Sequence, residues 1–355
     1  MFFRISTDGL EVATSFEGAY SGSTRTGCWI VGGGPSLTAL PCEQIAASPL
    51  PKFCVNLAGH GLLRPTFWTA YDPTGRFQKS TYLDASILKL LPRGRAMDVV
   101  PGTTAKVCDS PNTVFFDRDK TIGFRDFLTS GFRGVTDWQD SLIQAIDIAY
   151  RLGFRVLYLA GCDMHIRPSQ DWIELSRESG VTYAPRELLR DLHQRCLQRE
   201  VPMQVLDPDR QTQQYHFDES KPLAAAIQTD LHYFRVAQYL RLSRKAMALA
   251  GLELVSVTPN SRLNDYFPYV PAEQVLEDIH TEIGSPAAEP TRGLYTEQVS
   301  RTPQGLGPMR DFKPHHWTKE SGTARPAPSH PTRDQRLSRV AEAVREIPVS
   351  IREEG

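Results

Sequence analysis

Three glycines followed by a proline and a serine come directly after a short apolar run, in the stretch "CWIVGGGPSL". Glycine lets a backbone come close to a ligand, and the N–H groups at the start of a following helix favour a phosphate. The stretch therefore predicts a phosphate or ribose site at Gly32, Gly33, Gly34 and Ser36. It differs from the GxGxxG dinucleotide fingerprint because the third glycine is missing. A purely structural tight turn is the alternative.

Polar side chains also follow other apolar runs. Asn56 comes after one run, Asp72 after the next, and the run "LYLA" leads into Gly161, Asp163 and His165. Ligands of parallel sheets bind at the carboxyl ends of the strands, so we expect these residues to converge on one crevice. An aspartate at a strand end is also a common turn former, and that structural interpretation stays open for each of them.

Short apolar runs alternate with amphipathic segments along the chain. The clearest helix is predicted for residues 138–152, capped by Thr136 or Asp137 and ended by Gly153. Residues 221–251 predict one long helix or two. Strands are predicted at the opening run and at 53–56, 67–71, 97–100, 113–116, 155–160, 203–206 and 252–257, the last but one followed by Asp207 and Asp209. This alternation is typical of an α/β fold with a mainly parallel sheet and helices on both faces.

The composition divides the chain into three parts. Residues 1–26 form an N-terminal lead-in, 27–283 a nucleotide-binding domain, and 284–355 a tail rich in proline and charge. Such a tail cannot bury enough apolar surface to offset its ordering entropy, so we expect it to be largely disordered, with a short helix at 334–346. His315 and His316 in this tail have no nearby ligand set, which favours a solvated dipeptide over a metal site.

Charge and cysteine usage narrow the class of protein. The 355 residues include 40 basic and 41 acidic side chains, so no net field attracts the chain to nucleic acid or to an anionic membrane. The six cysteines form no CxxC pair, which favours reduced core residues. There is no apolar stretch of about 18 residues that could span a bilayer. We expect a cytoplasmic protein without a membrane span, of unspecified oligomeric state.

Three segments, taken in order, resemble a known family: "WIVGGGPSL", "CVNLAGHGLLRPTFWTAYDP" and "DSLIQAIDIAYRLGFRVLYLAGCDMHI". They look like the Rossmann-like family of 6-hydroxymethylpterin diphosphokinase MptE-like proteins, whose relatives include motility-associated glycosyltransferases that modify flagellin. The layout is also similar to the bacterial sialyltransferases of glycosyltransferase family 42, which use a CMP-activated sugar. The resemblance covers roughly residues 27 to 210 with gaps.

The sialyltransferase likeness implies a role for several residues. Gly33, Gly34 and Ser36 would meet the phosphate or ribose of the donor. Asn56 would hold the nucleotide, and Ser141 falls at the turn that opens the long helix.

The same likeness implies two catalytic residues. Asp163 sits at a strand end, and His165 stands where those enzymes carry a phosphate-binding tyrosine, so its imidazole would hydrogen-bond the leaving phosphate. The diphosphokinase likeness instead implies that Asp72 holds Mg²⁺ on ATP through its carboxylate oxygen.

Two departures from the sialyltransferase pattern affect the mechanism. The chain has Gly33 where those enzymes show asparagine, and residues 180–185 contain no histidine where their catalytic base would lie. His193 follows on a predicted helix, where a half-buried helix residue is the simpler interpretation. His165 or His216 would have to supply the base from another element.

Three functions are compatible with these features of the sequence. We expect a glycosyltransferase that takes a CMP-type sugar donor and a small-molecule or glycan acceptor, with inversion and no essential metal. The alternative is a Mg²⁺-dependent diphosphokinase that transfers pyrophosphate from ATP to a hydroxymethyl group. The third is a catalytically inert nucleotide-binding scaffold whose tail recruits a partner.

Overall fold

The computed structural model describes residues 1–355 except 6–7, 22–26, 59, 204–212 and 284–355. The predicted tail with its helix at 334–346, the His315–His316 pair, and both Asp207 and Asp209 lie outside the described residues. All described residues belong to one unit, Met1–Met309. Within them, no helix is long and apolar enough to cross a membrane, and none of the six cysteines forms a disulfide.

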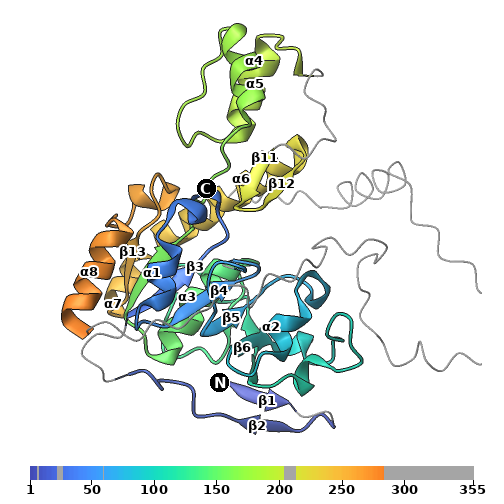
Figure 1. Cartoon of the computed structure of the whole chain (residues 1–355), viewed down its shortest axis with the longest axis vertical. Coiled ribbons are helices and arrows are strands. Elements are labelled where there is room, and N and C mark those ends of the chain that lie inside the picture. Colours follow the sequence, from blue (N-terminus) through green and yellow to red (C-terminus); the bar gives the residue numbers. More distant parts are fainter. Residues whose placement is uncertain (6–7, 22–26, 59, 204–212, 284–355) are drawn as a thin grey trace, which may run out of the picture. The chain divides into compact units, whose positions relative to one another are not determined.

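A nine-stranded sheet is the centre of this unit (Figure 1). In spatial order its strands are β13 (Glu253–Ser256), β10 (Val156–Ala160), β3 (Gly27–Val31), β4 (Lys52–Val55), β5 (Phe67–Thr69), β6 (Leu88–Pro92), β7 (Thr113–Phe116), β1 (Phe3–Ile5) and β2 (Glu11–Ala13). Every pairing from β13 to β7 is parallel, and β1 and β2 are antiparallel. The predicted α/β fold with a mainly parallel sheet is confirmed.

The strand order reverses at β3. This strand pairs with β4 on one side and with β10 on the other, so that Ile30 lies opposite Phe53 and Leu159. The chain builds the sheet outward from β3 to β7 and then returns to add β10 and β13 on the opposite side. Ligands of such sheets bind where the order reverses, outside the carboxyl ends of the strands. The end of β3 is therefore the place where a site is expected.

Helices cover both faces of the sheet. Every residue of β3 and β4 is buried, which requires cover above and below. The helix α3 (Ser141–Leu152) packs against β3, β4 and β5. The main unit is defined as the described residues outside 166–222, and its helices are α1 (Cys42–Ala47), α2 (Lys79–Leu83), α3 (Ser141–Leu152), α6 (Leu223–Leu242), α7 (Arg244–Leu249) and α8 (Ala272–Ile283).

The predicted helix at 138–152 is α3, but its cap differs from the prediction. Asp140 is the N-cap, and its Oδ1 accepts hydrogen bonds from the backbone N–H groups of Leu142 and Ile143 at 2.8 and 3.0 Å. Thr136 and Asp137 are engaged elsewhere, with Asp147 and Tyr71 respectively. At the other end Gly153 adopts a left-handed conformation with φ of 113°, as predicted for a helix stop.

The prediction of a strand at 97–100 is wrong. Val99 makes only an isolated bridge there, and the strand is β6, Leu88–Pro92. The apolar run of β6 is interrupted by Lys89, which is buried on a central strand and donates to the carbonyl oxygens of Asp84 and Ile87. Burial lowers the pKa of Lys89 to about 8. Such internal partners allow a charged residue inside a strand that hydrophobicity alone does not reveal.

Three other predicted segments can be compared with the structure. Residues 221–251 form two helices, α6 and α7, which meet at Ser243, and the hydroxyl of Ser243 donates to the carbonyl of Tyr239. The predicted lead-in 1–26 contributes β1 to the main sheet through the pairing of Phe3 with Phe115. Of the predicted strand 203–206, only Met203 is described, and it lies in no strand.

An insert, defined as residues 166–222, lies between β10 and α6. It contains α4 (Gln170–Glu178), α5 (Leu189–Gln198), β11 (Gln213–His216) and β12 (Glu219–Lys221). Its separate hydrophobic cluster includes Ile166, Trp172, Leu189, Leu192, Cys196 and Tyr215. The buried carboxylate of Asp230 on α6 accepts from the backbone N–H groups of Ile166 and Leu189, which fixes the insert to the main unit.

Candidate functional site

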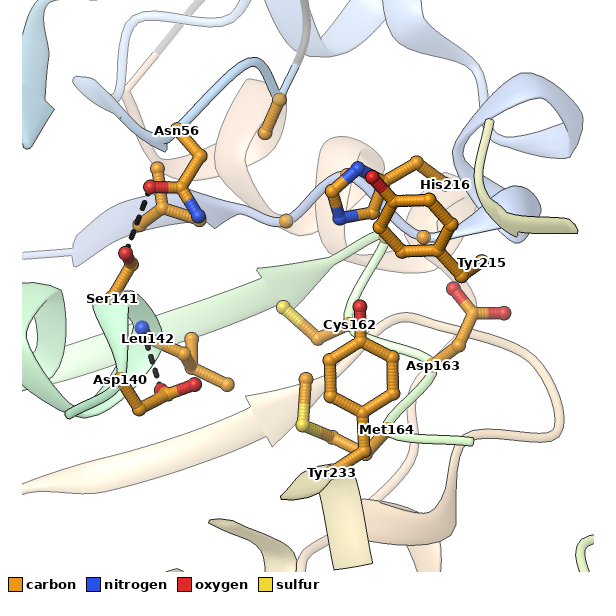
Figure 2. Close-up of a pocket in the computed structure, with 16 residues that line it drawn as sticks. Asn56, Asp140, Ser141, Leu142, Cys162, Asp163, Met164, Tyr215, His216 and Tyr233 are labelled. Carbon is orange, nitrogen blue, oxygen red and sulfur yellow. Dashed lines mark hydrogen bonds between the residues drawn. The ribbon is translucent and has the colours of Figure 1, made fainter. Parts of the chain in front are cut away.

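A cleft with two adjoining chambers lies at the carboxyl edge of the sheet. The inner chamber, with a cavity volume of about 70 Å³, is bordered by the turn after β3, the ends of β4 and β10, the start of α3, and side chains of β11 and α6 (Figure 2). The outer chamber, of about 320 Å³, extends to the loop after β5 and to β12. The chambers share Asn56, Asp140, Ser141, Tyr215, His216 and Tyr233, so they form one continuous cleft.

Most of the site residues predicted from the sequence meet in this cleft. Those that line the inner chamber are Gly32, Gly33, Gly34, Asn56, Ser141, Gly161 and Asp163. Asp72 lines the outer chamber. Ser36 and His165 belong to neither lining.

The glycine turn is packed against the end of β10 more tightly than side chains would allow. The N–H of Gly34 donates to the carbonyl of Gly161 at 2.8 Å. A Cβ added to Gly34 would lie 1.9 Å from Oδ2 of Asp163, and one added to Gly32 would lie 2.6 Å from the Gly161 oxygen. A Cβ on Gly33 would instead meet His216 at an ordinary 3.4 Å. Two of the three glycines are therefore required by packing, whatever the turn binds.

The segment after the turn differs from the predicted helix. A 3₁₀ helix, η1 (Pro35–Ala39), is followed after a break by the six-residue α1. Such short elements carry little macrodipole, because the dipole sums over aligned peptide units. Any phosphate held here would depend on side chains and single N–H groups rather than on a long helix.

The carboxylate of Asp163 is hydrogen-bonded to the residue that follows the glycine turn and its proline. The hydroxyl of Ser36 donates to Asp163 Oδ2 at 2.7 Å. Burial raises the pKa of Asp163, and the hydrogen bond from Ser36 opposes this rise. His165 lies beside the same residue, with its Nδ1 3.0 Å from the Asp163 carbonyl oxygen. Ser36, Asp163 and His165 thus form a hydrogen-bonded cluster beside the glycine turn.

Asn56 and Ser141 form the opposite wall of the inner chamber. The hydroxyl of Ser141 donates to Asn56 Oδ1 at 2.8 Å and accepts from the backbone N–H of Tyr71 at 3.0 Å. Asn56 has a positive φ of 53°, a conformation that asparagine tolerates better than most residues. With its oxygen held by Ser141, the amide nitrogen of Asn56 faces the chamber (Figure 2). It can donate to a ligand there.

His216 and Glu219 form a hydrogen-bonded pair across the β11–β12 hairpin. His216 Nδ1 lies 2.7 Å from Glu219 Oε2, and the hydroxyl of Tyr215 donates to the same oxygen at 2.7 Å. The hydrogen bond from His216 lowers the pKa of Glu219, so this carboxylate stays ionised. An ionised acceptor at Nδ1 selects the tautomer with the proton on Nδ1, which leaves the Nε2 lone pair available to take a proton. This is the arrangement of a general base.

Tyr233 on α6 contributes a hydroxyl to the space between His216 and Cys162 (Figure 2). Burial raises the pKa of Tyr233 well above its ordinary value, so the group stays protonated and can donate a hydrogen bond. None of the hydrogen bonds between described residues uses this hydroxyl. It is therefore available to a ligand.

Charged side chains from separate elements line the outer chamber. Arg76 Nη1 lies 2.5 Å from Asp72 Oδ2. Lys221 Nζ donates to Thr229 Oγ1 at 2.9 Å and lies 3.9 Å from the centre of the Tyr215 ring.

His232 on α6 is paired with the cap of α3. Its Nε2 lies 3.2 Å from Asp140 Oδ2, and this hydrogen bond raises the pKa of His232. Each carboxylate of the outer chamber thus has a basic partner: Asp72 has Arg76, Asp140 has His232, and Glu219 has His216.

The residues around Asp72 fit a magnesium ion poorly. Mg²⁺ prefers oxygen ligands and is usually bound by one or two free carboxylates. The carboxylate of Asp72 is engaged by Arg76, and Lys221 lies in the same chamber. Across the described ranges, no group of three or more His, Cys, Asp or Glu side chains is arranged to hold a metal.

Sequence reasoning missed Glu219, Lys221 and Tyr233 as site residues. His216 was considered as a base from another element, but nothing in the linear pattern places it against Gly33. The backbone bond from Phe217 N–H to the Gly33 carbonyl, at 2.9 Å, makes this connection. The only signal in the sequence is a histidine and a glutamate three residues apart around a short turn, in "YHFDESK".

Comparisons with known proteins do not identify the chain: no family model matches its sequence, and no curated protein or solved structure is significantly similar to it. The family resemblance of the motifs stays a prediction.

Proposed function

We propose that this protein is a transferase that moves a group, most simply a glycosyl group, from a nucleotide-linked donor of the CMP type to a hydroxyl acceptor. The observation that supports this is the meeting of three features in one cleft where the strand order reverses. These are the glycine turn after β3, the Asn56–Ser141 wall, and the His216–Glu219 pair.

The chemistry follows from the free atoms of the cleft. The acceptor oxygen attacks the anomeric carbon of the donor while Nε2 of His216 takes the proton of the attacking hydroxyl. The bond between that carbon and the donor phosphate oxygen breaks, and the phosphate leaves with the electron pair. The protonated Tyr233 hydroxyl and the Asn56 amide then donate hydrogen bonds to the charge that develops on the leaving phosphate. Glu219 stabilises the imidazolium that forms.

His216 replaces His165 as the proposed base. His216 lines both chambers, so it can contact the acceptor and the donor at once. His165 lines neither, and its Nδ1 is directed to the Asp163 carbonyl. Asp163 is assigned to positioning the turn, because its carboxylate is already bonded to Ser36.

The first experiment is a thermal-shift and calorimetric titration of the full chain with CMP, CDP, UDP, GDP and ATP, each with Mg²⁺ and with EDTA. A ligand that binds only the folded state stabilises it by about 2.7 kcal/mol at a hundredfold excess over Kd. We expect CMP to stabilise the protein in both buffers. Stabilisation by ATP with Mg²⁺ alone would favour the diphosphokinase. Binding without turnover of any donor would favour the scaffold, and no binding at all would contradict the proposal.

Two asparagines provide a matched pair for the binding site. Asn56 and Asn112 both have positive φ, 53° and 48°, so alanine at either position carries a similar backbone cost. Asn112 donates to the carbonyl of Ala85, outside the cleft. We expect Asn56→Ala to weaken CMP binding about tenfold, the loss of roughly one hydrogen bond to a charged group. Asn112→Ala should leave CMP binding unchanged, and equal effects of the two would contradict the assignment.

A further inference from the structure

The outer chamber gathers basic side chains that the proposed transfer does not use. Arg76 comes from η2 (Thr74–Arg76), Lys221 from the end of β12, and His232 from α6. η2 is far in the sequence from β12 and α6, which follow one another, and the fold brings all three elements to one cavity. His232 is paired with Asp140. Arg76 is paired with Asp72, whereas Lys221 forms no ion pair with a carboxylate of the described residues.

Lys221 is a half-buried ammonium without a carboxylate partner. An ammonium has three N–H donors, and one of them is used by the neutral hydroxyl of Thr229. The face of the Tyr215 ring lies beside it. Within the described residues no aspartate or glutamate forms an ion pair with Lys221. Removing a cation from water in this way is costly unless a counter-charge is supplied.

Arg76 adds a second cation to the same cavity. Its guanidinium has five N–H donors, and its ion pair with Asp72 is made through Nη1. Burial, and after it the charge of Arg76, lower the pKa of Lys221, while the charges of Glu219 and Asp72 act in the opposite direction. Because Arg76 and Lys221 line the same cavity, an anion bound beside both would reduce the repulsion between the two cations.

The carboxylates of the cavity do not supply this anion. Asp72 is bonded to Arg76, and Glu219 accepts from both His216 and Tyr215. Asp140 caps α3 and accepts from His232. None of these three carboxylates forms an ion pair with Lys221, and a bound anion would supply that contact.

We infer that Lys221 and Arg76 form a second anion subsite, in the outer chamber, that binds a phosphate group other than the one held beside the glycine turn. The guanidinium plane and the ammonium together match a tetrahedral oxyanion. The inference rests on the proposed function, because that function assigns the first phosphate to the inner chamber. The second phosphate belongs either to a nucleoside diphosphate donor or to a phosphorylated acceptor.

The test compares Lys221→Gln with Lys245→Gln in the full chain, since Lys245 is an exposed lysine of α7 outside the cleft. Calorimetry with inorganic phosphate and pyrophosphate, without nucleotide, should show binding to the parent protein that weakens about tenfold in Lys221→Gln and is unchanged in Lys245→Gln. Lys221→Arg should retain most of the binding. Equal binding by both glutamine variants, or no binding to the parent protein, would overturn the inference.

A second variant covers the case in which loss of Lys221 disturbs folding. Thr229→Asp keeps the lysine and places a carboxylate beside its ammonium, which should abolish phosphate binding. Unimpaired phosphate binding to a folded Thr229→Asp variant would also overturn the inference.

Nucleotides then separate the two sources of the phosphate. If the donor carries it, Lys221→Gln should weaken CDP about tenfold and leave CMP unchanged. If the acceptor carries it, Lys221→Gln should change the affinity for CMP and for CDP equally little. Inorganic phosphate should then bind to the CMP-saturated parent protein but not to the CMP-saturated Lys221→Gln variant. Phosphate binding through Lys221 in a protein that binds no nucleotide would refute the proposed function while the anion subsite stands. Nucleotide binding together with no effect of Lys221→Gln on the binding of inorganic phosphate, pyrophosphate or nucleotide would do the reverse.

Discussion

The glycine turn and the β11–β12 hairpin lie side by side, joined by the bond from Phe217 N–H to the Gly33 carbonyl, and they differ in how their polar atoms are used. In the turn, Ser36 bonds to Asp163, and the N–H of Gly34 bonds to the Gly161 carbonyl. In the hairpin, one nitrogen of His216 is held by Glu219, while the other faces the cleft. The Ser36 hydroxyl and the Gly34 N–H of the turn are therefore used within the fold, whereas His216 of the hairpin has only one of its two ring nitrogens bonded to a described residue.

This difference indicates that the residues of the turn hold the site in place and that those of the hairpin take part in the reaction. A polar group that already has an internal partner must lose that bond before it can serve a ligand, at a cost of about 1 kcal/mol or more. A group oriented by one partner, with a second atom free, meets no such cost. We therefore expect substitutions in the turn to change mainly stability, and those in the hairpin to change mainly turnover.

The largest expected effect concerns two histidines. His216→Gln removes the proposed base and should lower kcat about a thousandfold, with little change in the unfolding midpoint. His165→Gln should change kcat little, because His165 lies outside both chambers. Steady-state kinetics with the donor identified by the titrations measures both.

Glu219→Gln sharpens this test, because it removes the ionised partner of His216. It should lower kcat, since the imidazolium that forms when His216 takes the proton loses its counter-charge. A larger loss in His165→Gln than in His216→Gln would reverse the assignment.

The next largest effect is on stability within the turn. Gly34→Ala would place a Cβ 1.9 Å from Asp163 Oδ2, so we expect it to lower the free energy of unfolding by roughly 3 kcal/mol. Gly33→Ala is the matched control. Its Cβ meets only ordinary contacts, the nearest at 3.4 Å, and stability should change by less than about 1 kcal/mol. Urea denaturation followed by circular dichroism measures both, and equal losses would show that the turn is looser than described.

Substitution in the hydrogen-bonded cluster beside the glycine turn should have a smaller effect on stability. Ser36→Ala removes the donor to the partly buried carboxylate of Asp163 and should cost about 2 kcal/mol of stability. Thr38→Ala, which removes an exposed hydroxyl of the same 3₁₀ helix, should cost less than about 0.5 kcal/mol. If Ser36→Ala instead lost turnover at unchanged stability, Ser36 would be a ligand-binding residue.

The smallest effect depends on pH. Because the hydrogen bond to Asp140 raises the pKa of His232 in the folded state, its stabilisation is complete below the ordinary value of 6.5 and is lost as the pH rises through the folded pKa. His232→Gln should therefore cost about 0.5 kcal/mol near pH 5.5 and almost nothing near pH 8.5.

His193 supplies a control of opposite sign. Burial lowers the pKa of His193, so protonation disfavours the folded state, and His193→Gln should be relatively more stable at the acidic pH. Unfolding curves at both pH values test the pair. The same pH trend in both variants would contradict the Asp140–His232 interaction.

The sequence was sufficient for the elements that are specified locally. The 3.6-residue periodicity and Gly153 defined the helix α3, and the apolar runs located β4, β5, β7, β10 and β13 to within two residues. It failed at β6, where the buried Lys89 interrupts the run, because the carbonyl groups that satisfy this lysine belong to the preceding loop. It also chose the wrong cap for α3, because the partners of Thr136 and Asp137 are set by tertiary contacts.

The sequence by itself determined the α/β class, the mainly parallel sheet and the strand-end rim on which Gly32, Asn56 and Gly161 meet, because parallel strands align their carboxyl ends at one edge. Only the tertiary structure decided which rim residues are free. Asp163 and Asp72 are engaged by Ser36 and Arg76. The hairpin brings Nε2 of His216 to this rim through the bond between Phe217 and Gly33. Local spacing in the sequence does not reveal such a bond between distant segments.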